Sequence, residues 1–170
     1  MSVSIREARR DDAAAIAAIH NIGIAERSAT FETEPRSEGQ VVARLEDSDR
    51  YPLLVAVDED LDRVVGWAGL GEYRPRVCYA GIGEFSIYLS PEARGRGIGR
   101  TLLLALIDAA GARGYWKLVS RVFPFNAASR ALCRSCGFRE VGVYEKHAML
   151  DGRWLDVVIV ERLIGSPVGR

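Results

Sequence analysis

The spacing of hydrophobic and polar residues predicts alternating strands and helices along the chain. A short strand is expected at Val3–Ala8, and Asp11 or Asp12 is expected to open the helix that follows it. Ser37 and Gln40 have the spacing of a capping box, so a second helix should begin at Ser37. The remaining predicted elements are strands at Leu53–Val57, Val64–Leu70 and Gly81–Leu89, a helix at Gly97–Arg113, a strand at Leu118–Phe123, a helix at Ala127–Cys136, and a hairpin from Val141 to Leu163 that turns at Asp151 and Gly152.

This order of elements, β-α-α-β-β-β-α-β-α-β-β, indicates a mixed α/β protein with a strongly twisted, largely antiparallel sheet. The chain has 170 residues and contains no stretch rich enough in Pro, Gly or Ser to be a linker. A chain of this length can bury about 70% of its unfolded surface in one core. We therefore expect residues 1–170 to form a single domain.

Composition and charge narrow the class of protein. Hydrophobic residues make up 48% of the chain, which excludes a disordered protein, and the 23 basic residues balance the 23 acidic ones. The sequence has no net charge and no basic face with interleaved aromatic residues. Binding to nucleic acid or to an anionic membrane is therefore not expected. The longest aliphatic run, Leu102–Ile107, is too short to span a bilayer, so a cytoplasmic protein is expected.

One segment combines glycines and arginines between a predicted strand and a predicted helix: Arg94-Gly95-Arg96-Gly97-Ile98-Gly99-Arg100. Glycines let a ligand approach the backbone closely, and the free N–H groups at the start of a helix bind phosphate groups. The Gly-Lys pair of a P-loop is absent, and Arg100 stands where a dinucleotide fingerprint needs Gly. On the glycines alone a simple turn is an equally good interpretation, but the arginines favour a phosphate site.

This segment resembles the acetyl-CoA loop of the GNAT superfamily of N-acetyltransferases, whose pattern is Arg/Gln-x-x-Gly-x-Gly/Ala. Asn126, Ser129, Gly137 and Phe138 are similar to a second element of that superfamily. The resemblance implies a twisted, largely antiparallel central sheet with helices on both faces, and acetyl-CoA as cosubstrate without a metal. It also implies a cosubstrate site made of Ile87, Tyr88, Leu89, Arg94, Gly95, Arg96, Gly97, Ile98, Gly99, Arg100, Asn126 and Ser129.

Within the superfamily the chain is similar to the phosphinothricin, methionine sulfoximine and arsinothricin acetyltransferases. This similarity implies a small amine substrate, namely an amino acid or an antimetabolite analogue, and a homodimer. Leu150 and Asp151 stand where the phosphinothricin enzymes have Lys-His, so the individual substrate stays open. The residues that carry the similarity are Ile19-His20-Asn21, Ala29-Thr30-Phe31-Glu32, Arg76-x-x-Tyr79, Glu84-x-Ser86-Ile87-Tyr88 and Trp154-x-Asp156-Val157.

Glu84 is the candidate general base. It shares a strand face with Ser86 and Tyr88 and lies roughly 17 Å before the end of the predicted strand, which suits a pantetheine arm running along that strand. A carboxylate there can remove a proton from an ammonium group, and the N–H groups near Tyr88 and Leu89 can polarise a thioester carbonyl. From the residues alone, a structural pair between Glu84 and an Arg is an equally good interpretation, whereas the resemblance assigns the base to Glu84.

Arg74 and Arg76 are candidates for binding the acidic groups of a substrate, because a guanidinium can bind a carboxylate or phosphinate through two hydrogen bonds. The resemblance assigns this role to Arg76, with Tyr79 in the same motif. A solvated pair of surface charges is the alternative. Phe31 is a candidate for lining the same pocket, although a lone aromatic is more often part of the core.

Other reactive residues favour structural interpretations. Cys133 and Cys136 have C-x-x-C spacing, but they lie at the end of a predicted helix, so core packing is preferred over redox or zinc chemistry. Cys133 also stands in the region where many GNAT enzymes carry a Tyr as general acid. His20 lies on a helix with Ile16 and Ile19 and is interpreted as a structural histidine.

The resulting prediction is an acetyl-CoA-dependent N-acetyltransferase that transfers the acetyl group directly, with Glu84 as general base. One alternative is an enzyme that acetylates a protein N-terminus, a lysine or a polyamine, and Arg74 with Arg76 argues against the polyamine. A second alternative is a binding module that holds acyl-CoA without turnover. The presence of Glu84 argues against such a sensor.

Overall fold

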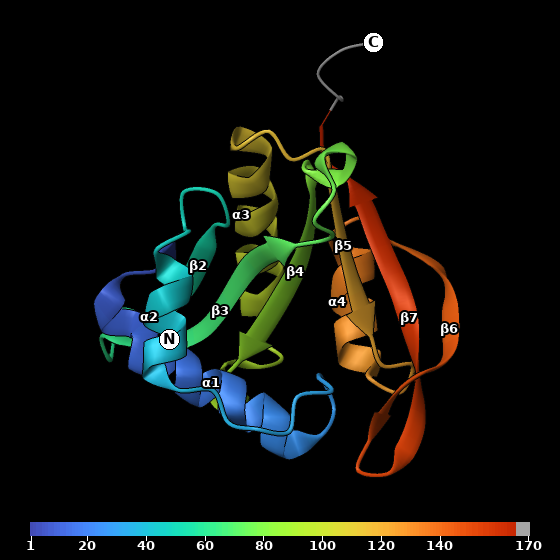
Figure 1. Ribbon diagram of the computed structural model, residues 1–170. Helices are drawn as coiled ribbons and strands as arrows, with labels where there is room; N and C mark the ends of the chain where they lie inside the picture. Colours follow the sequence, from blue (N-terminus) through green and yellow to red (C-terminus); the bar gives the residue numbers. More distant parts are fainter. Residues whose placement is uncertain (166–170) are drawn as a thin grey trace.

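The fold is built on one seven-stranded sheet in the order β1-β2-β3-β4-β5-β7-β6 (Figure 1). The computed structural model describes residues 1–165. Neighbouring strands are antiparallel except β4 and β5, which are parallel. The elements are β1 (Val3–Glu7), α1 (Ala13–Glu26), α2 (Glu38–Leu45), β2 (Leu53–Asp58), β3 (Arg63–Glu72), β4 (Ile82–Leu89), α3 (Ile98–Ala112), β5 (Lys117–Val122), α4 (Ala127–Ser135), β6 (Arg139–Leu150) and β7 (Arg153–Leu163).

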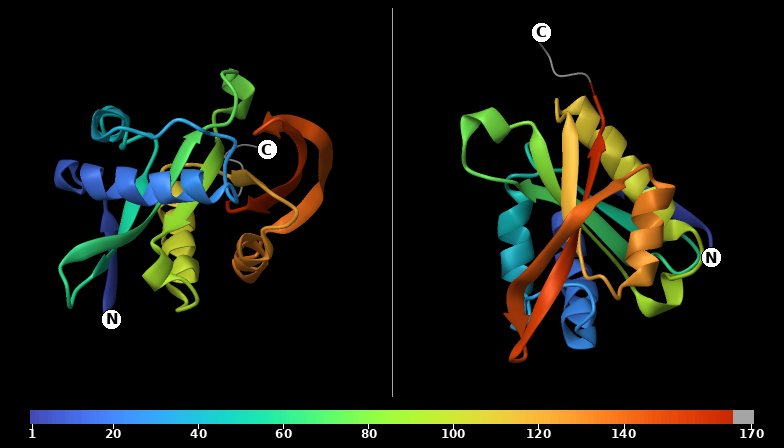
Figure 2. Two further views of the ribbon diagram at one scale, coloured as in Figure 1. Left: turned by 90° about the horizontal axis from the view of Figure 1, so that it is seen from below. Right: turned by 90° about the vertical axis from the view of Figure 1, so that its right-hand side faces the viewer.

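Helices cover both faces of the sheet, as the resemblance implied (Figure 2). On one face, α1 and α2 pack on the sheet through a cluster that includes the fully buried Trp67 of β3. On the other face, α3 packs through Leu102, Leu103 and Leu106 on a larger apolar cluster that includes Leu70. The predicted mixed α/β class with a largely antiparallel sheet is confirmed.

Local sequence signals decide where several elements begin and turn. The predicted capping box is present at α2, where Ser37 Oγ accepts from the Gln40 N–H at 3.2 Å and Gln40 Oε1 accepts from the Ser37 N–H at 2.8 Å. At α1, Asp12 is the N-cap residue but its side chain makes no cap bond, because it pairs with Arg6 at 2.7 Å. The predicted turn between β6 and β7 lies at Asp151 and Gly152, with φ of 48° and 75°.

The two parallel strands separate after the first three residues of β4, which opens the sheet (Figure 1). Pairing between β4 and β5 ends at Glu84 and Val119. Just beyond, the Ser120 hydroxyl donates to the Phe85 carbonyl at 2.9 Å, so the backbone polar groups of Phe85 face β5. Because these groups alternate along a strand, those of Ile87 and Leu89 face the gap as well. By the same alternation the backbone polar groups of Tyr88 face Trp67 of β3, and those of its neighbours Ile87 and Leu89 are the ones at the gap.

Candidate active site

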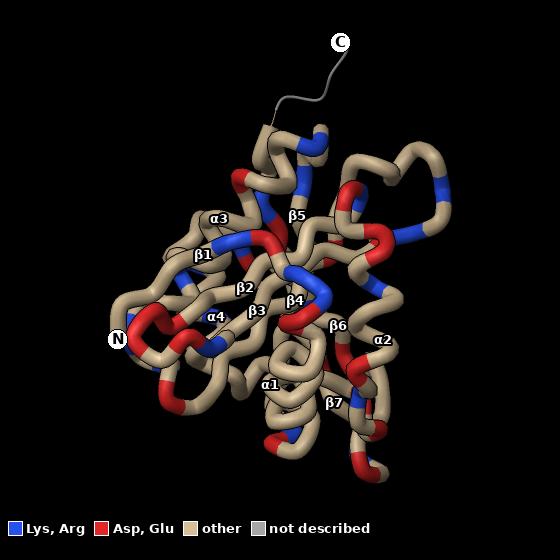
Figure 3. Tube along the Cα trace, turned by 90° about the vertical axis from the view of Figure 1, so that its left-hand side faces the viewer, with Lys and Arg blue, Asp and Glu red and all other residues tan. Residues whose placement is uncertain are grey.

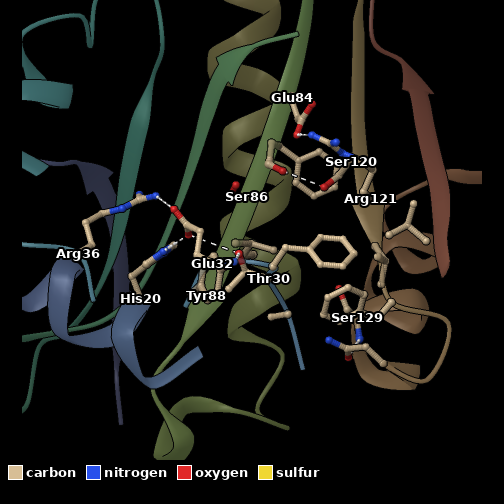
Figure 4. Close-up of a pocket in the computed structure, with 18 of the residues that line it drawn as sticks. His20, Thr30, Glu32, Arg36, Glu84, Ser86, Tyr88, Ser120, Arg121 and Ser129 are labelled. Atoms are coloured by element: carbon tan, nitrogen blue, oxygen red, sulfur yellow. Dashed lines mark hydrogen bonds and ion pairs between the residues drawn. The ribbon is translucent and has the colours of Figure 1, made fainter. Parts of the chain in front are cut away.

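A cavity of about 470 Å³ lies where β4 and β5 separate (Figure 4). Its walls come from α1, the segment between α1 and α2, the middle of β4, the end of β5 and the start of α4. The predicted residues that line this cavity are Phe31, Glu84, Ile87, Tyr88, Asn126 and Ser129. The structure therefore brings together residues that are far apart in the sequence. For example, the Asn126 side chain donates to the Ser28 carbonyl, 98 positions away.

Glu84 lies on β4 at the point where the strands separate, and its side chain is 29% exposed. Arg121 of β5 donates to Glu84 Oε1 at 2.5 Å (Figure 4). Among the described residues Arg121 is the one that pairs with this carboxylate. Both interpretations of Glu84 are thus compatible with the geometry, because the carboxylate is bound to an Arg and also faces the cavity.

Tyr88 lines the cavity, and its ring packs on that of the fully buried Trp67. The two rings are stacked with their centroids 5.1 Å apart, and the Tyr88 ring also lies 4.8 Å from the imidazole of His20. Burial and the negative charge of Glu32 raise the pKa of Tyr88 to about 12. The phenol therefore stays protonated at neutral pH.

A second set of charged residues lies across the cavity from Glu84 and was not predicted from the sequence (Figure 4). His20 Nε2 lies 2.5 Å from Glu32 Oε2, and Arg36 donates to Glu32 Oε1 at 2.7 Å. Arg44 of α2 completes the set. Sequence spacing alone places His20 on the buried face of α1 and cannot show that Glu32, twelve residues later, comes back to it.

The ion pair and the burial of this set affect both titratable groups. Burial first, and the positive charge of Arg36 second, lower the pKa of His20, whose side chain is 3% exposed. For Glu32, burial acts to raise the pKa, but the hydrogen bonds and charges of Arg36 and His20 outweigh it, so the pKa is lowered. At neutral pH the imidazole is neutral and the carboxylate is charged.

The glycine-rich segment leads into α3 as predicted. Gly95 and Gly97 have φ of 71° and 79°, and a Cβ built on either would meet no atom within 4 Å. Gly97 is the N-cap of α3 and provides no side-chain cap, so the first N–H groups of the helix are left to other partners. Such an end, with its positive helix dipole, is suited to an anion.

Two of the three arginines in this segment are bound within the protein. Arg94 forms a two-bond ion pair with Glu26 of α1, at 2.9 and 3.0 Å, and also donates to the Leu89 carbonyl. Arg96 donates to the Glu92 carbonyl at 2.8 Å. Arg100 is exposed, and its guanidinium has no protein partner among the described residues. We infer that Arg94 shapes the segment and that Arg100 is the guanidinium available to a ligand.

Asn126 and Ser129 lie at the start of α4. Asn126 Oδ1 caps the helix by accepting from the Ser129 N–H at 3.0 Å, and its Nδ2 donates to the Ser28 carbonyl at 3.0 Å. The amide therefore ties α4 to the segment after α1. Phe31, on that segment, meets Phe123 edge to face with centroids 4.9 Å apart.

Arg74, Arg76 and Tyr79 do not reach this cavity. They line a separate hollow of about 200 Å³ at the β3–β4 connection. Arg74 lies over the ring of Tyr73 and Arg76 over that of Tyr79, at 5.3 and 5.9 Å. Their predicted role in substrate binding is therefore not explained by the cavity that contains Glu84.

Cys133 and Cys136 are buried, and Cys133 packs in the apolar cluster beneath α3. Burial raises the pKa of the Cys133 thiol to about 12, and neither cysteine lines the cavity. Residues 1–165 contain no helix long and apolar enough to cross a membrane and no cluster of side chains suited to a metal ion. Acidic and basic residues are interspersed over the face of the molecule seen in Figure 3.

Comparison with known proteins gives a consistent result. Residues 16–138 match the acetyltransferase (GNAT) family. An L-methionine sulfoximine/L-methionine sulfone acetyltransferase from Pseudomonas aeruginosa is 36% identical over 95% of this chain and 94% of its own length. A solved phosphinothricin acetyltransferase from Sinorhizobium meliloti in complex with AcCoA has a TM-score of 0.90 and 34% identity, covering 99% of this chain and 91% of that one. A solved ribosomal-protein-alanine N-acetyltransferase from Brucella melitensis has a TM-score of 0.89 and 36% identity, covering 94% and 99%.

The buried imidazole predicts a pH-dependent stability. Because the pKa of His20 is lowered on folding, the unfolded chain takes up a proton on this imidazole before the folded protein does. The contribution to the free energy of unfolding is complete above roughly pH 6.5 and is lost as the pH falls from there through the folded-state pKa. In His20→Gln, the slope of unfolding free energy against pH just below about pH 6.5 should be smaller by up to about 1.4 kcal/mol per pH unit. Urea unfolding at a series of pH values measures this, with His147→Gln on exposed β6 as the matched control. Equal slopes in the wild type and His20→Gln would contradict it.

Proposed function

The chain belongs to the acetyltransferase (GNAT) family, and on this premise we propose that it transfers the acetyl group of acetyl-CoA to the α-amine of a small amino acid or antimetabolite analogue. The substrate is of the phosphinothricin, methionine sulfoximine or arsinothricin type. One observation carries the proposal: Glu84 lies in the cavity at the inner end of an open strand edge that leads to the uncapped start of α3.

The residues present fit acetyl-CoA. The N–H groups at the start of α3 suit its pyrophosphate, with Arg100 beside them. The open edge of β4 runs roughly 17 Å from Leu89 back to Glu84 at strand rise, and the N–H groups of Ile87 and Leu89 can hold the amides of the pantetheine arm and the thioester oxygen. Bound there, acetyl-CoA supplies an activated acetyl group next to the carboxylate.

Glu84 is the proposed general base. Arg121 orients the carboxylate through Oε1, while the side chain also faces the cavity. Glu84 removes a proton from the substrate ammonium, directly or through water, and the neutral amine then attacks the thioester carbonyl within a ternary complex. The CoA thiolate is a good leaving group, and the buried Cys133 thiol does not line the cavity, so it is not proposed as an acid.

The charges of the cavity support an acidic substrate. Three guanidinium groups line it, those of Arg36, Arg44 and Arg121, against two carboxylates, those of Glu32 and Glu84. His20 is neutral, so the walls carry one positive charge in excess. A polyamine would add further positive charge, whereas an amino acid with an acidic group would balance it.

A homodimer is supported by the exposed face of the C-terminal hairpin. Large apolar side chains on β6 and β7 are 46% to 56% exposed, an arrangement typical of protein interfaces. A second copy of the chain is the proposed occupant. The residues concerned are Val141, Val143, Tyr144, Met149 and Trp154. The cytoplasmic location stays a prediction.

Replacing Gly97 with Val tests the cosubstrate site. The side chain would occupy the open space at the start of α3, and affinity for acetyl-CoA should fall by about tenfold or more through lost charge-assisted hydrogen bonds. Gly114→Val is the matched control, because Gly114 lies just beyond the other end of the same helix with φ of 86° and equally open surroundings. Calorimetric titration should show wild-type affinity in the control. Equal affinities in both variants would remove the phosphate site from the proposal.

Replacing Glu84 with Gln tests the base. The amide keeps the shape but accepts no proton, so turnover should fall by about 10² to 10⁴ with little change in acetyl-CoA affinity. The loss should shrink at high pH, where the substrate amine is already neutral. Release of free thiol is the measurement, and Glu46→Gln on the exposed end of α2 is the control. A variant as fast as the wild type at neutral pH would exclude Glu84 as the base.

Comparing substrates tests the proposed class. The ratio kcat/KM for phosphinothricin, methionine sulfoximine and arsinothricin should exceed that for spermidine and for a peptide with an N-terminal alanine by at least about tenfold, the value of one charge-assisted hydrogen bond. Preference for the peptide or for spermidine would support the alternative enzymes instead. Thiol release with none of the five would support the acyl-CoA-binding module.

A further inference from the structure

Arg44 is the charged residue of the cavity that the proposed reaction leaves without a role. Arg36 pairs with Glu32 and Arg121 pairs with Glu84, whereas Arg44 forms no ion pair with any described residue. Its guanidinium donates to the Leu70 carbonyl at 3.0 Å and lies over the ring of Trp67, 5.3 Å from its centroid. Most of its hydrogen-bonding capacity is therefore unused.

The sequence of β3 makes room for this guanidinium. A Cβ built on Gly69 would lie 2.6 Å from Arg44 Nη2 and 2.6 Å from Leu53 Cδ1, so the Arg44 side chain crosses the strand at a position where a larger residue would displace it. Gly69 is directly opposite Ser86 on β4. Residues paired in this way share a sheet face, so Arg44 lies on the face that carries Glu84, Ser86 and Tyr88.

The distance from Arg44 to Glu84 suits a small amino acid. Ser86 is two residues from Glu84, which is about 7 Å along the strand, and Gly69 is about 5 Å across the sheet from Ser86. The two side chains extend toward the cavity from these positions. A molecule with its amine at Glu84 thus has an acidic group a few bonds away within reach of Arg44.

The surroundings of Arg44 favour a bound anion. Burial, together with the positive charge of Arg36, lowers the pKa of Arg44 to about 10. The guanidinium is still charged at neutral pH, but its burial and the nearby positive charge destabilise the charged form. Trp67 Nε1, on the ring beneath the guanidinium, and His20 Nδ1, on a ring 5.6 Å from that of Trp67, are buried and have no hydrogen-bond partner among the described residues. A negative group in this part of the cavity would compensate the charge.

We propose that Arg44 binds an acidic group of the substrate while the amine lies at Glu84. This inference rests on the proposed function and deepens it, because it names the residue that selects an acidic amino acid. It also differs from the prediction for Arg74 and Arg76, which line another hollow. The acidic group is the α-carboxylate, which all the candidate substrates carry, or the second acid that phosphinothricin carries in addition.

The test measures KM and kcat of the full-length protein for phosphinothricin and methionine sulfoximine, and acetyl-CoA affinity by calorimetry. In Arg44→Gln, KM should rise by about 10-fold to 100-fold while acetyl-CoA affinity is kept, because a charge-assisted hydrogen bond is lost. Arg44→Lys should recover part of the loss. Arg10→Gln, at an exposed arginine far along the chain, is the control and should match the wild type.

The two substrates identify the acidic group. A similar rise in KM for both assigns the α-carboxylate, and a rise for phosphinothricin alone assigns its second acid. An unchanged KM for both in a folded Arg44→Gln, an equal loss of acetyl-CoA affinity, or a rise in KM with Arg76→Gln alone would overturn the inference. If the wild type acetylates neither substrate, the proposed function itself fails, which is a distinct result.

A second pair of variants leaves Arg44 in place. Gly69→Ala should push the guanidinium off the strand and raise KM by about tenfold, as expected for one misplaced charge-assisted bond. Gly71→Ala, two residues further on the same strand, adds a Cβ whose nearest neighbour is a backbone oxygen at 4.0 Å and should keep KM near the wild-type value. Equal KM values in the two variants would contradict the placement of Arg44 in the substrate site.

Discussion

The early end of the pairing between β4 and β5 is the constraint on which the site depends. Backbone N–H and C=O groups in a protein interior need partners, so an open strand edge inside a sheet is costly unless something fills it. The protein covers part of the edge itself, with Ser120 bound to the Phe85 carbonyl and Arg94 bound to the Leu89 carbonyl. The groups of Ile87 between them face the gap, where a ligand with amides of its own can complete the sheet.

Arginine side chains decide how the surrounding charge is distributed. Each carboxylate of the cavity is bound by one guanidinium, Glu84 by Arg121 and Glu32 by Arg36, and these bonds orient both carboxylates. Exposed pairs of this kind add little to stability, so their value lies in orientation. Arg44 breaks this pattern because it pairs with no carboxylate among the described residues, and the positive charge it leaves in excess is the basis of the proposal that the cavity takes an acidic ligand.

The sequence predicts best what is encoded locally. The capping box at Ser37, the turn at Asp151 and Gly152, and the glycine-rich start of α3 depend on neighbouring residues and are all present. The lining role of Phe31 and Ser129 was implied by a resemblance rather than by spacing. The contact of His20 with Glu32 and the crossing of Arg44 over Gly69 depend on how α1 and α2 pack on the sheet, and no local pattern contains that information.

The same limit explains Arg74 and Arg76. Their position just before β4 in the sequence suggests proximity to Glu84, yet both arginines belong to the β3–β4 connection and line a hollow there that does not include Glu84. The β3–β4 connection lies at the end where β4 begins, next to Tyr79 and Arg50, and it forms its own hollow there. Proximity in sequence therefore overestimated proximity in space.

Both halves of the proposed reaction meet at the segment between α1 and α2. Arg94, from the glycine-rich segment, pairs with Glu26 at the end of α1, and Asn126, from the start of α4, binds the Ser28 carbonyl. The elements that would hold acetyl-CoA thus hold the segment that carries Phe31 and Glu32 into the cavity. Binding of acetyl-CoA to the glycine-rich segment and to the start of α4 would therefore also order the segment that carries Phe31 and Glu32. Direct transfer between two bound substrates requires both to be positioned together in this way.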